Sequence, residues 1–333
     1  ITGSVGKTTT KEYIFNILSE IAPTLKTLGN ENNLIGLPKT IFRIKPIHKF
    51  AVLELGSNHF GEISYLADIC SPDIGIITSV GAAHLEFFGN LDGVFKEKSS
   101  LLRRPLELKI YPDDEKFSEF AGITFGTSSH CDYRISKIKP SENSTSFFVN
   151  FEEFSIPTPY EKFVPNATIA IALASEMQIS KSLIRKGLQK PLSISQRMEI
   201  IPFNDGFILN DCYNANPDSM KAAIAFWLKF HPEKPHVAVL GDMLELGEKT
   251  DFFHREIGKI LKNEHFHLLI SVGKFARSFQ AKFHFPSVQK LIDSKIYKTF
   301  SANSVILLKA SHSVALEKLI PYLRQITVNQ RKD

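Results

Sequence analysis

The sequence predicts an α/β protein with two domains. Apolar segments typical of strands alternate with amphipathic segments typical of helices along almost all of the 333 residues, a pattern that favours parallel sheets covered by helices. The chain is also too long for one ordinary hydrophobic core. A break at Pro191-Leu192-Ser193 interrupts the alternation. We therefore expect a first domain over residues 1–191 and a second over 192–333.

The first domain is predicted to hold a mainly parallel sheet with a β-rich excursion. Ile14, Ile17, Leu18 and Ile21 recur at helical spacing within residues 7–21. Strands are expected near 50–55 and 74–78, the β-rich excursion over about 105–160, and helices after Asn166 and over 180–189.

The second domain is predicted to be a Rossmann-like, doubly wound sheet, because strands and helices alternate regularly to its end. Strands are expected at 207–209, 237–240, 268–270 and 305–308. Helices are expected from Pro217, near 251–263, after 270 and near 313–324.

Composition excludes some classes of protein but selects none. No apolar run approaches the ~20 residues that a membrane-spanning helix needs, so membrane insertion is not expected. The formal charge of +5 is scattered and fits anionic small substrates as well as nucleic acid. The cysteines Cys70, Cys131 and Cys212 lie far apart, which suggests neither a disulfide framework nor a zinc site.

A glycine-rich loop, Gly3-Ser4-Val5-Gly6-Lys7-Thr8-Thr9, opens the first predicted helix. In such a loop the backbone N–H groups and the helix N-terminus surround phosphate oxygens, while a lysine adds positive charge. This makes the first domain a P-loop domain that binds a nucleoside triphosphate, with Thr8 offering its hydroxyl to Mg²⁺. An ordinary glycine-rich turn with a solvated lysine remains the alternative. No strand precedes the loop, so we expect the sequence to be cut at its N-terminus.

Three further polar residues of the first domain follow or face apolar segments. Glu54 ends a predicted strand, where a carboxylate can reach the magnesium of a bound nucleotide, although a solvated glutamate would look the same. His84 follows the strand at 74–78 and is by itself as consistent with a structural role. Lys98 shares an apolar helical face with Val94 and Leu101, whereas Lys96 and Glu97 point elsewhere. An inward lysine snorkels, pairs or takes part in chemistry.

The second domain offers three polar positions. Arg197 follows the predicted hinge, where closure of the domain could bring its guanidinium onto a phosphoryl group; a surface arginine is the alternative. Asn216 and Pro217 have the residue types of an N-cap and a first helical position. Asp242 follows a strand, where carboxylates bind ribose hydroxyls, and it too could be turn chemistry.

The order of these motifs resembles that of the Mur ligase family of ATP-dependent ligases. The resemblance spans the whole chain, and the blocks that carry it are residues 2–9, 29–38, 54–58 with 61–63, 83–86 with Lys98, 196–199, 210–220 and 240–248. The block Tyr213-Asn214-Ala215-Asn216-Pro217 and the block Gly241-Asp242-Met243-Leu244-Glu245-Leu246-Gly247 are typical of the branch that adds D-alanyl-D-alanine.

The resemblance implies a role for each matching residue. It implies that residues Gly3, Ser4, Val5, Gly6, Lys7, Thr8 and Thr9 hold the ATP phosphates, with Asn214 near the base and Asp242 on the ribose. The implied metal ligands are Thr8, Glu54, His84 and a carbamylated Lys98. The implied catalytic residues are Lys7, His84, Lys98 and Arg197, and the implied substrate contacts are Asn30, Asn33, Lys309 and Ser311.

The implied reaction joins D-alanyl-D-alanine to UDP-N-acetylmuramoyl-tripeptide with ATP and Mg²⁺, through an acyl phosphate. It implies a cytoplasmic monomer that binds no nucleic acid. A sibling Mur ligase, a folylpolyglutamate-type synthetase and a non-catalytic nucleotide-binding scaffold stay open as alternatives.

The sequence departs from the family in three places. The family's first domain is absent from the sequence, so weak binding of the precursor is expected. Of a His-Asn pattern only Asn166 remains, and the family's Lys-Gly-Ser-Arg appears as Lys309-Ala310-Ser311-His312.

Overall fold

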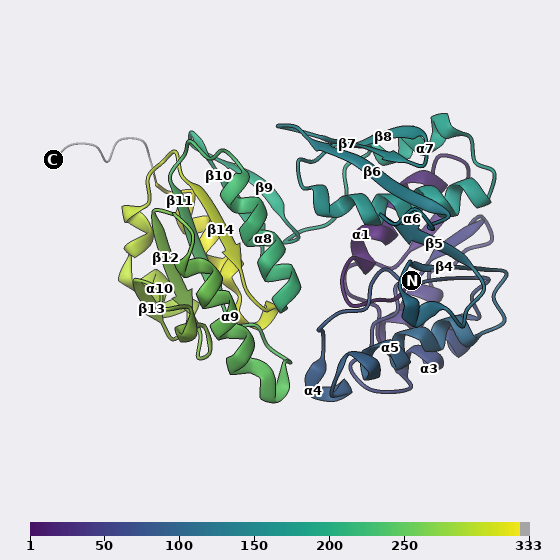
Figure 1. Ribbon diagram of the computed structural model, residues 1–333, viewed down its shortest axis with the longest axis horizontal. Coiled ribbons are helices and arrows are strands. Elements are labelled where there is room, and N and C mark those ends of the chain that lie inside the picture. Colours follow the sequence, from purple (N-terminus) through teal and green to yellow (C-terminus); the bar gives the residue numbers. More distant parts are fainter. Residues whose placement is uncertain (327–333) are drawn as a thin grey trace. The chain divides into compact units, whose positions relative to one another are not determined.

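The computed structural model describes residues 1–326, which form two compact units. The first unit is Ile1–Ser193 and the second begins at Ile194, so the division falls beside the Pro191-Leu192-Ser193 segment. Residues 327–333 of the predicted second domain lie outside the described part. Both units combine a mainly parallel sheet with helices (Figure 1), as the predicted α/β class requires.

The main sheet of the first unit has the strand order β3-β4-β5-β6-β7-β8. Its strands are β3 (Ile74–Ile76), β4 (Leu108–Pro112), β5 (Ile123–Gly126), β6 (Tyr133–Pro140), β7 (Thr145–Val149) and β8 (Glu152–Ile156). The pairs from β3 to β6 are parallel, whereas β6, β7 and β8 are antiparallel. The β-rich stretch therefore extends the main sheet, first with parallel strands and then with the antiparallel strands β7 and β8.

The first residues of the chain connect this sheet to a smaller one. Strands β1 (Thr24–Lys26) and β2 (Phe50–Val52) pair in parallel. The Leu55 N–H donates to the Ile1 carbonyl, and the Thr2 N–H donates to the carbonyl of Ile76 beside it. Thr2 also forms a parallel bridge with Ile77. Ile1 and Thr2 thus occupy the place of the strand that feeds a phosphate-binding loop.

Helices surround these sheets and close the core of the first unit. They are α1 (Lys7–Leu18), α2 (Gly36–Ile41), α3 (Glu62–Cys70), α4 (Leu85–Phe88), α5 (Leu91–Ser99), α6 (Val164–Glu176) and α7 (Lys181–Leu188), with 3-10 turns at Ser100–Arg103, Glu115–Phe117 and Glu161–Phe163. Buried side chains of α1 and α6 share one core cluster. Helix α1 also packs closely on α7, because a Cβ on Gly187 would lie 2.6 Å from the Ile17 Cα.

The second unit has one sheet with the order β13-β12-β11-β14-β10-β9. Its strands are β9 (Glu199–Phe203), β10 (Gly206–Asp211), β11 (His236–Gly241), β12 (Leu268–Val272), β13 (Phe283–Phe285) and β14 (Val305–Lys309). All pairs are parallel except β9 with β10. Strand β14 lies between β10 and β11 (Figure 1), so the carboxyl ends of these three strands meet at one place.

Helices α8 (Pro217–Lys229), α9 (Thr250–Lys262), α10 (Val288–Ser294) and α11 (Ile320–Leu323) complete the unit, with 3-10 turns at Gly247–Lys249, Ala276–Phe279, Ile296–Thr299, His312–Val314 and Leu316–Leu319. The prediction of one helix over 313–324 is wrong, because Ala315 adopts φ 58° and interrupts it. The predicted N-cap of α8 is confirmed: Asn216 accepts from the Ser219 N–H at 2.8 Å. Within residues 1–326, every helix is too short or too polar to cross a bilayer.

Candidate active site

The loop from Gly3 to Thr9 forms a cradle at the N-terminus of α1. Gly3 and Gly6 have φ values of 145° and 90°, which side chains rarely tolerate. A Cβ on Gly3 would also lie 2.1 Å from the Thr78 hydroxyl, so glycine is required there. The first N–H groups of a helix have no partner within it and favour an anion at that end. The Lys7 ammonium folds back to donate to the Gly3 carbonyl at 2.7 Å, which keeps its charge at the loop.

A short hydrogen-bond chain joins this cradle to the strand-end glutamate. The Thr8 hydroxyl donates to Glu54 Oε2 at 2.9 Å, and the Asn32 amide donates to Glu54 Oε1 at 2.8 Å. The Glu54 side chain is only 1% exposed, so these contacts fix its orientation. The structure thus brings together two predicted metal ligands that lie far apart in the sequence.

Buried charges behind Glu54 balance its carboxylate. The Lys11 ammonium lies 3.9 Å from Glu54 Oε2 and 3.4 Å from the Glu12 carboxylate. Lys26 pairs with the other Glu12 oxygen at 2.5 Å. Burial lowers the pKa of Lys11, and Glu54 and Glu12 oppose that shift. Alternating charges of this kind keep several ions out of water without leaving one uncompensated.

This donor set fits magnesium carried by a nucleotide better than a dedicated metal cage. Residues 1–326 contain no group of three or more histidine, cysteine or acidic side chains able to hold a metal. Thr8 and Glu54 supply hard oxygen atoms beside the phosphate cradle. Mg²⁺ prefers such oxygens and takes its remaining ligands from water and substrate phosphates.

Lys98 is buried at 1% exposure and donates to the Ser57 hydroxyl at 2.7 Å. Burial, reinforced by the nearby positive charge of Lys7, lowers the pKa of Lys98 from 10.5 to about 7. A large share of this amine is therefore neutral at physiological pH and able to act as a nucleophile.

Glu97, expected to point away from the interior, is buried as well. Its two oxygens accept from the N–H groups of Gly61 and Ile63. Glu97 therefore caps α3, a role in which a carboxylate meets backbone donors at a helix N-terminus. The helical-face argument was wrong for Glu97 because it ignored the neighbouring helix.

His84 and Lys98 meet at one aromatic ring. His84 adopts φ 55° at the N-terminus of α4, and its ring meets Phe88 edge-on with centroids 6.4 Å apart. The Lys98 ammonium lies 5.6 Å from the centroid of the same Phe88 ring. The His84 imidazole and the Lys98 amine thus lie near the same Phe88 ring.

The predicted substrate contacts Asn30 and Asn33 lie in the exposed loop before α2. Asn33 already accepts through its side-chain oxygen from the N–H groups of Ile35 and Gly36. These contacts hold the turn that leads into α2. Asn30 accepts through its backbone carbonyl from the Asn32 N–H, which shapes the loop that delivers Asn32 to Glu54.

In the second unit Arg197 stacks on an aromatic ring. Its guanidinium carbon lies 3.7 Å from the centroid of the Tyr213 ring, and the His312 ring centroid lies 6.0 Å from the same centroid. An arginine over a tyrosine face gains a cation–π interaction and keeps its N–H groups at the edge.

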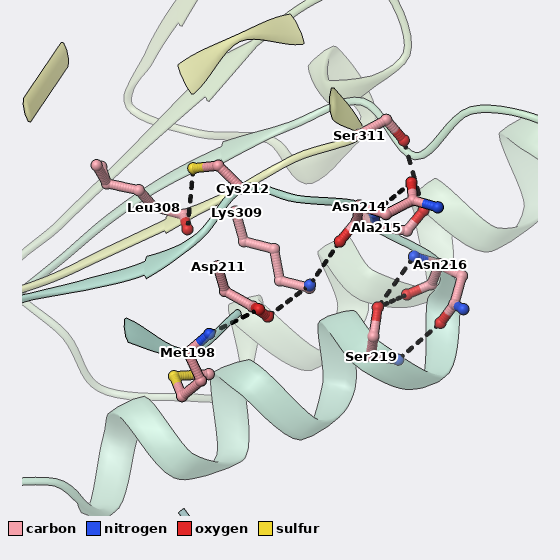
Figure 2. Close-up of polar contacts among 10 residues, drawn as sticks. All are labelled: Met198, Asp211, Cys212, Asn214, Ala215, Asn216, Ser219, Leu308, Lys309 and Ser311. Atoms are coloured by element: carbon pink, nitrogen blue, oxygen red, sulfur yellow. Dashed lines mark hydrogen bonds and ion pairs between the residues drawn. The ribbon is translucent and has the colours of Figure 1, made fainter. Parts of the chain in front are cut away.

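Lys309 and Ser311, the other two predicted substrate contacts, are both buried. Lys309 is 1% exposed and donates to Asp211 at 2.6 Å and to the Asn214 carbonyl at 3.0 Å (Figure 2). Ser311 is also buried, and its hydroxyl accepts from the Leu244 N–H. Both side chains are engaged within the protein because β14 lies between β10 and β11.

Asp242, expected on a ribose, is likewise engaged by the protein. Its carboxylate accepts from the N–H groups of Lys274, Phe275 and Ala276 at 2.6–2.9 Å, and the residue is 6% exposed. Asn214 is exposed, with its side-chain oxygen near the Ala215 N–H. Of the two predicted nucleotide contacts of this unit, Asn214 is thus the accessible one.

Two family patterns cover most of the chain. Residues 1–174 match the Mur ligase middle domain, and residues 196–312 match the Mur ligase glutamate ligase domain. The chain belongs to the Mur ligase family.

Similar proteins show which Mur ligases this chain resembles. The UDP-N-acetylmuramoyl-tripeptide–D-alanyl-D-alanine ligase of Bacillus subtilis (strain 168) is 33% identical over 339 residues, covering 96% of this chain and 74% of the relative. A crystal structure of MurF from Acinetobacter baumannii superposes with a TM-score of 0.88 at 32% identity, covering 97% of this chain and 75% of that one. A MurF ligase from Thermotoga maritima in complex with ADP gives a TM-score of 0.86 at 26% identity, covering 98% and 79%.

Three residues that contact predicted site residues of this Mur ligase were not themselves among the predicted ones. Asn32 holds Glu54. Asn166 donates to the Thr10 hydroxyl at 3.0 Å and to the Gly6 carbonyl, which ties α6 to the phosphate loop. The Tyr213 ring packs against the Arg197 guanidinium. Asn32 and Tyr213 both stand in recognised blocks, beside residues that were chosen instead.

Proposed function

We propose that this chain forms a peptide bond at the expense of ATP, joining D-alanyl-D-alanine to UDP-N-acetylmuramoyl-tripeptide in cell-wall precursor synthesis. The observation that carries the proposal is the hydrogen bond from Thr8 to the buried Glu54 beside the phosphate loop, in the unit that also buries the Lys98 amine. The names of the B. subtilis and A. baumannii relatives support the substrates. We further propose that the protein works in the cytoplasm as a monomer, without binding nucleic acid.

The first step activates the terminal carboxylate of the tripeptide. A carboxylate oxygen attacks the γ-phosphorus of ATP, the bond to the bridging oxygen breaks, and ADP leaves with that electron pair. The loop N–H groups and Lys7 stabilise charge on the phosphates, and Arg197 is our proposed contact to the transferred phosphoryl group. Thr8 and Glu54, together with His84 and Lys98, would hold Mg²⁺, which would supply charge neutralisation.

Lys98 contributes through its lowered pKa. Its neutral amine adds to carbon dioxide and releases a proton, which leaves a carbamate that bears negative charge. Such an anion suits a metal-facing position, whereas the unmodified ammonium would repel a cation. Ser57, which accepts from the Lys98 amine, would then donate to the carbamate.

The second step makes the peptide bond. The amine of D-alanyl-D-alanine attacks the acyl carbon of the acyl phosphate, a proton leaves the nitrogen, and inorganic phosphate departs. The exposed loop with Asn30 and Asn33 is our proposed contact to the precursor, and Asn214 is our proposed contact to the nucleotide base. Lys309, Ser311 and Asp242 are assigned to holding the second unit together.

The test is the substrate dependence of ADP release by the protein that carries this chain. ADP release is expected to need both the tripeptide precursor and D-alanyl-D-alanine, with one phosphate released per peptide bond. Single amino acids and a folate with glutamate serve as competing acceptors. ATP turnover that ignores D-alanyl-D-alanine would assign the chain to another ligase, and nucleotide binding without any turnover would assign it to a scaffold.

A further inference from the structure

The turn that carries Arg197 is strained on both sides. Gln196 and Met198 have φ values of 59° and 48°, in the left-handed region that residues with side chains rarely occupy. A residue with a side chain persists in this region only where its surroundings hold it. Arg197 therefore depends on whatever fixes residues 196 and 198.

The segment from Asp211 to Tyr213 holds this turn at both ends. The Tyr213 N–H donates to the Gln196 carbonyl at 2.9 Å. The Met198 N–H donates to Asp211 Oδ1 at 3.0 Å. The Tyr213 ring then receives the Arg197 guanidinium. Two hydrogen bonds from backbone N–H groups thus hold the turn, and one ring packs against the arginine that the turn carries.

The position of Asp211 is fixed in turn by Lys309. Asp211 and Lys309 are paired residues of the neighbouring strands β10 and β14. Figure 2 shows the Asp211 carboxylate between Lys309 and the backbone of Met198, with Lys309 also bonded to the Asn214 carbonyl. Lys309 is 1% exposed and the Asp211 side chain 16%. A half-buried carboxylate that lost this cation would turn toward water and release Met198.

We propose that Lys309 is a positioning residue for Arg197, acting through Asp211 on the strained turn. This assignment replaces the substrate contact that the sequence suggested for Lys309. The effect on catalysis rests on the proposed function, because it requires Arg197 to act on the transferred phosphoryl group. The effect on the Arg197 side chain does not, since the contacts that link Lys309, Asp211 and Tyr213 to the turn lie within the second unit.

The kinetic experiment compares Lys309→Met with Lys318→Met, which removes an exposed lysine of the same unit. Misplacement of a catalytic group costs on the order of 10- to 100-fold in rate, so kcat should fall by that range in Lys309→Met. The KM values for ATP, the tripeptide precursor and D-alanyl-D-alanine should change less than about threefold, because ground-state binding is retained. A selective rise in the precursor KM with unchanged kcat would overturn the proposal and restore a substrate contact.

A second measurement is independent of activity. In protein labelled with ¹³C and ¹⁵N at arginine, the δ-CH₂ signal of Arg197, assigned with Arg197→Lys, should lie upfield because of the Tyr213 ring. It should move toward its free position in Lys309→Met and stay in place in Lys318→Met. Should Lys309→Met fail to fold, Asp211→Asn takes its place, since an amide N–H₂ facing the Lys309 ammonium breaks the pair while leaving an acceptor. An unmoved Arg197 signal in the folded variant would refute the proposal, whereas an inactive wild-type protein would refute only the proposed ligase function.

Discussion

Two lysines, one in each unit, are equally buried and have opposite surroundings. Lys98 and Lys309 are both 1% exposed. Lys98 donates to a neutral hydroxyl, and burial together with the positive charge of Lys7 lowers its pKa to about 7. Lys309 meets a carboxylate at 2.6 Å. The partner, and not burial alone, thus decides whether a buried lysine is prepared for chemistry or serves as a counter-charge.

The same contrast extends to the other polar groups of the two units. In the first unit, Thr8 and Glu54 converge beside the phosphate cradle. In the second unit, Asp242, Ser311 and Lys309 are engaged by the protein itself. We infer that the first unit provides most of the reactive groups, while the buried polar groups of the second mainly hold its loops in place.

The largest expected effect comes from removing the reactive lysine. Lys98→Ala should lower kcat by on the order of 100-fold or more, the scale for losing a charge-stabilising group, and added bicarbonate should not restore it. Lys96→Ala, which removes the exposed lysine of the same helix, should retain near-normal activity. Steady-state ADP release measures both. Equal losses of kcat in the two variants would contradict a special role for Lys98.

Asp242 tests the inference that the buried polar groups of the second unit hold its loops in place. Asp242→Ala leaves three backbone N–H groups without their acceptor, so the free energy of unfolding should fall by about 2–4 kcal/mol. Chemical denaturation measures the loss, with Asp251→Ala at an exposed position as the control. Unchanged stability together with a raised KM for ATP would instead support the ribose contact predicted from the sequence.

The difference between the two units also explains what the sequence could reveal. The phosphate loop is local, so its glycines, Lys7 and Thr8 could be identified from spacing alone. Lys98 could be identified because helical periodicity marks a charged residue on an apolar face. The contact of Lys309 with Asp211 spans 98 positions and depends on β14 entering between β10 and β11. No local pattern specifies that insertion.

Short elements limited the fold prediction in the same way. Strands β9 and β13 lie at the two edges of the second sheet, where half of the strand hydrogen bonds are absent and the apolar signal is weak. They were missed, as was the break at Ala315. Asn32 could not be separated from Asn30 and Asn33, because the turn of the loop decides which amide reaches Glu54.

A smaller effect is expected from pH at a buried histidine of the second unit. His254 accepts from the Met243 N–H through Nε2, and its Nδ1 meets the Thr250 carbonyl. Burial lowers the pKa of His254 below 6.5. As pH falls below 6.5, His254 therefore binds a proton in the unfolded chain before it does so in the folded protein. The free energy of unfolding is thus retained above pH 6.5 and decreases below it.

One such proton contributes a slope of up to about 1.4 kcal/mol per pH unit. Unfolding curves from pH 7.5 to 5 should show this extra slope in the wild type and in His265→Gln, an exposed control. His254→Gln should lack it. Parallel pH profiles for all three proteins would mean that the folded environment of His254 accepts the charge.

The smallest effect tests whether the motif Tyr213-Asn214-Ala215-Asn216-Pro217 combines a structural part with a functional one. Asn216 caps α8 in a reciprocal pair with Ser219 (Figure 2), so Asn216→Ala should lower the free energy of unfolding by about 1 kcal/mol. Activity of the folded variant should stay near normal. Asn214→Ala should instead lower activity and leave the free energy of unfolding nearly unchanged, because its exposed side chain caps no helix. If Asn216→Ala instead reduced kcat without loss of stability, the capping residue would itself belong to the reactive site, and the second unit would resemble the first more than its contacts indicate.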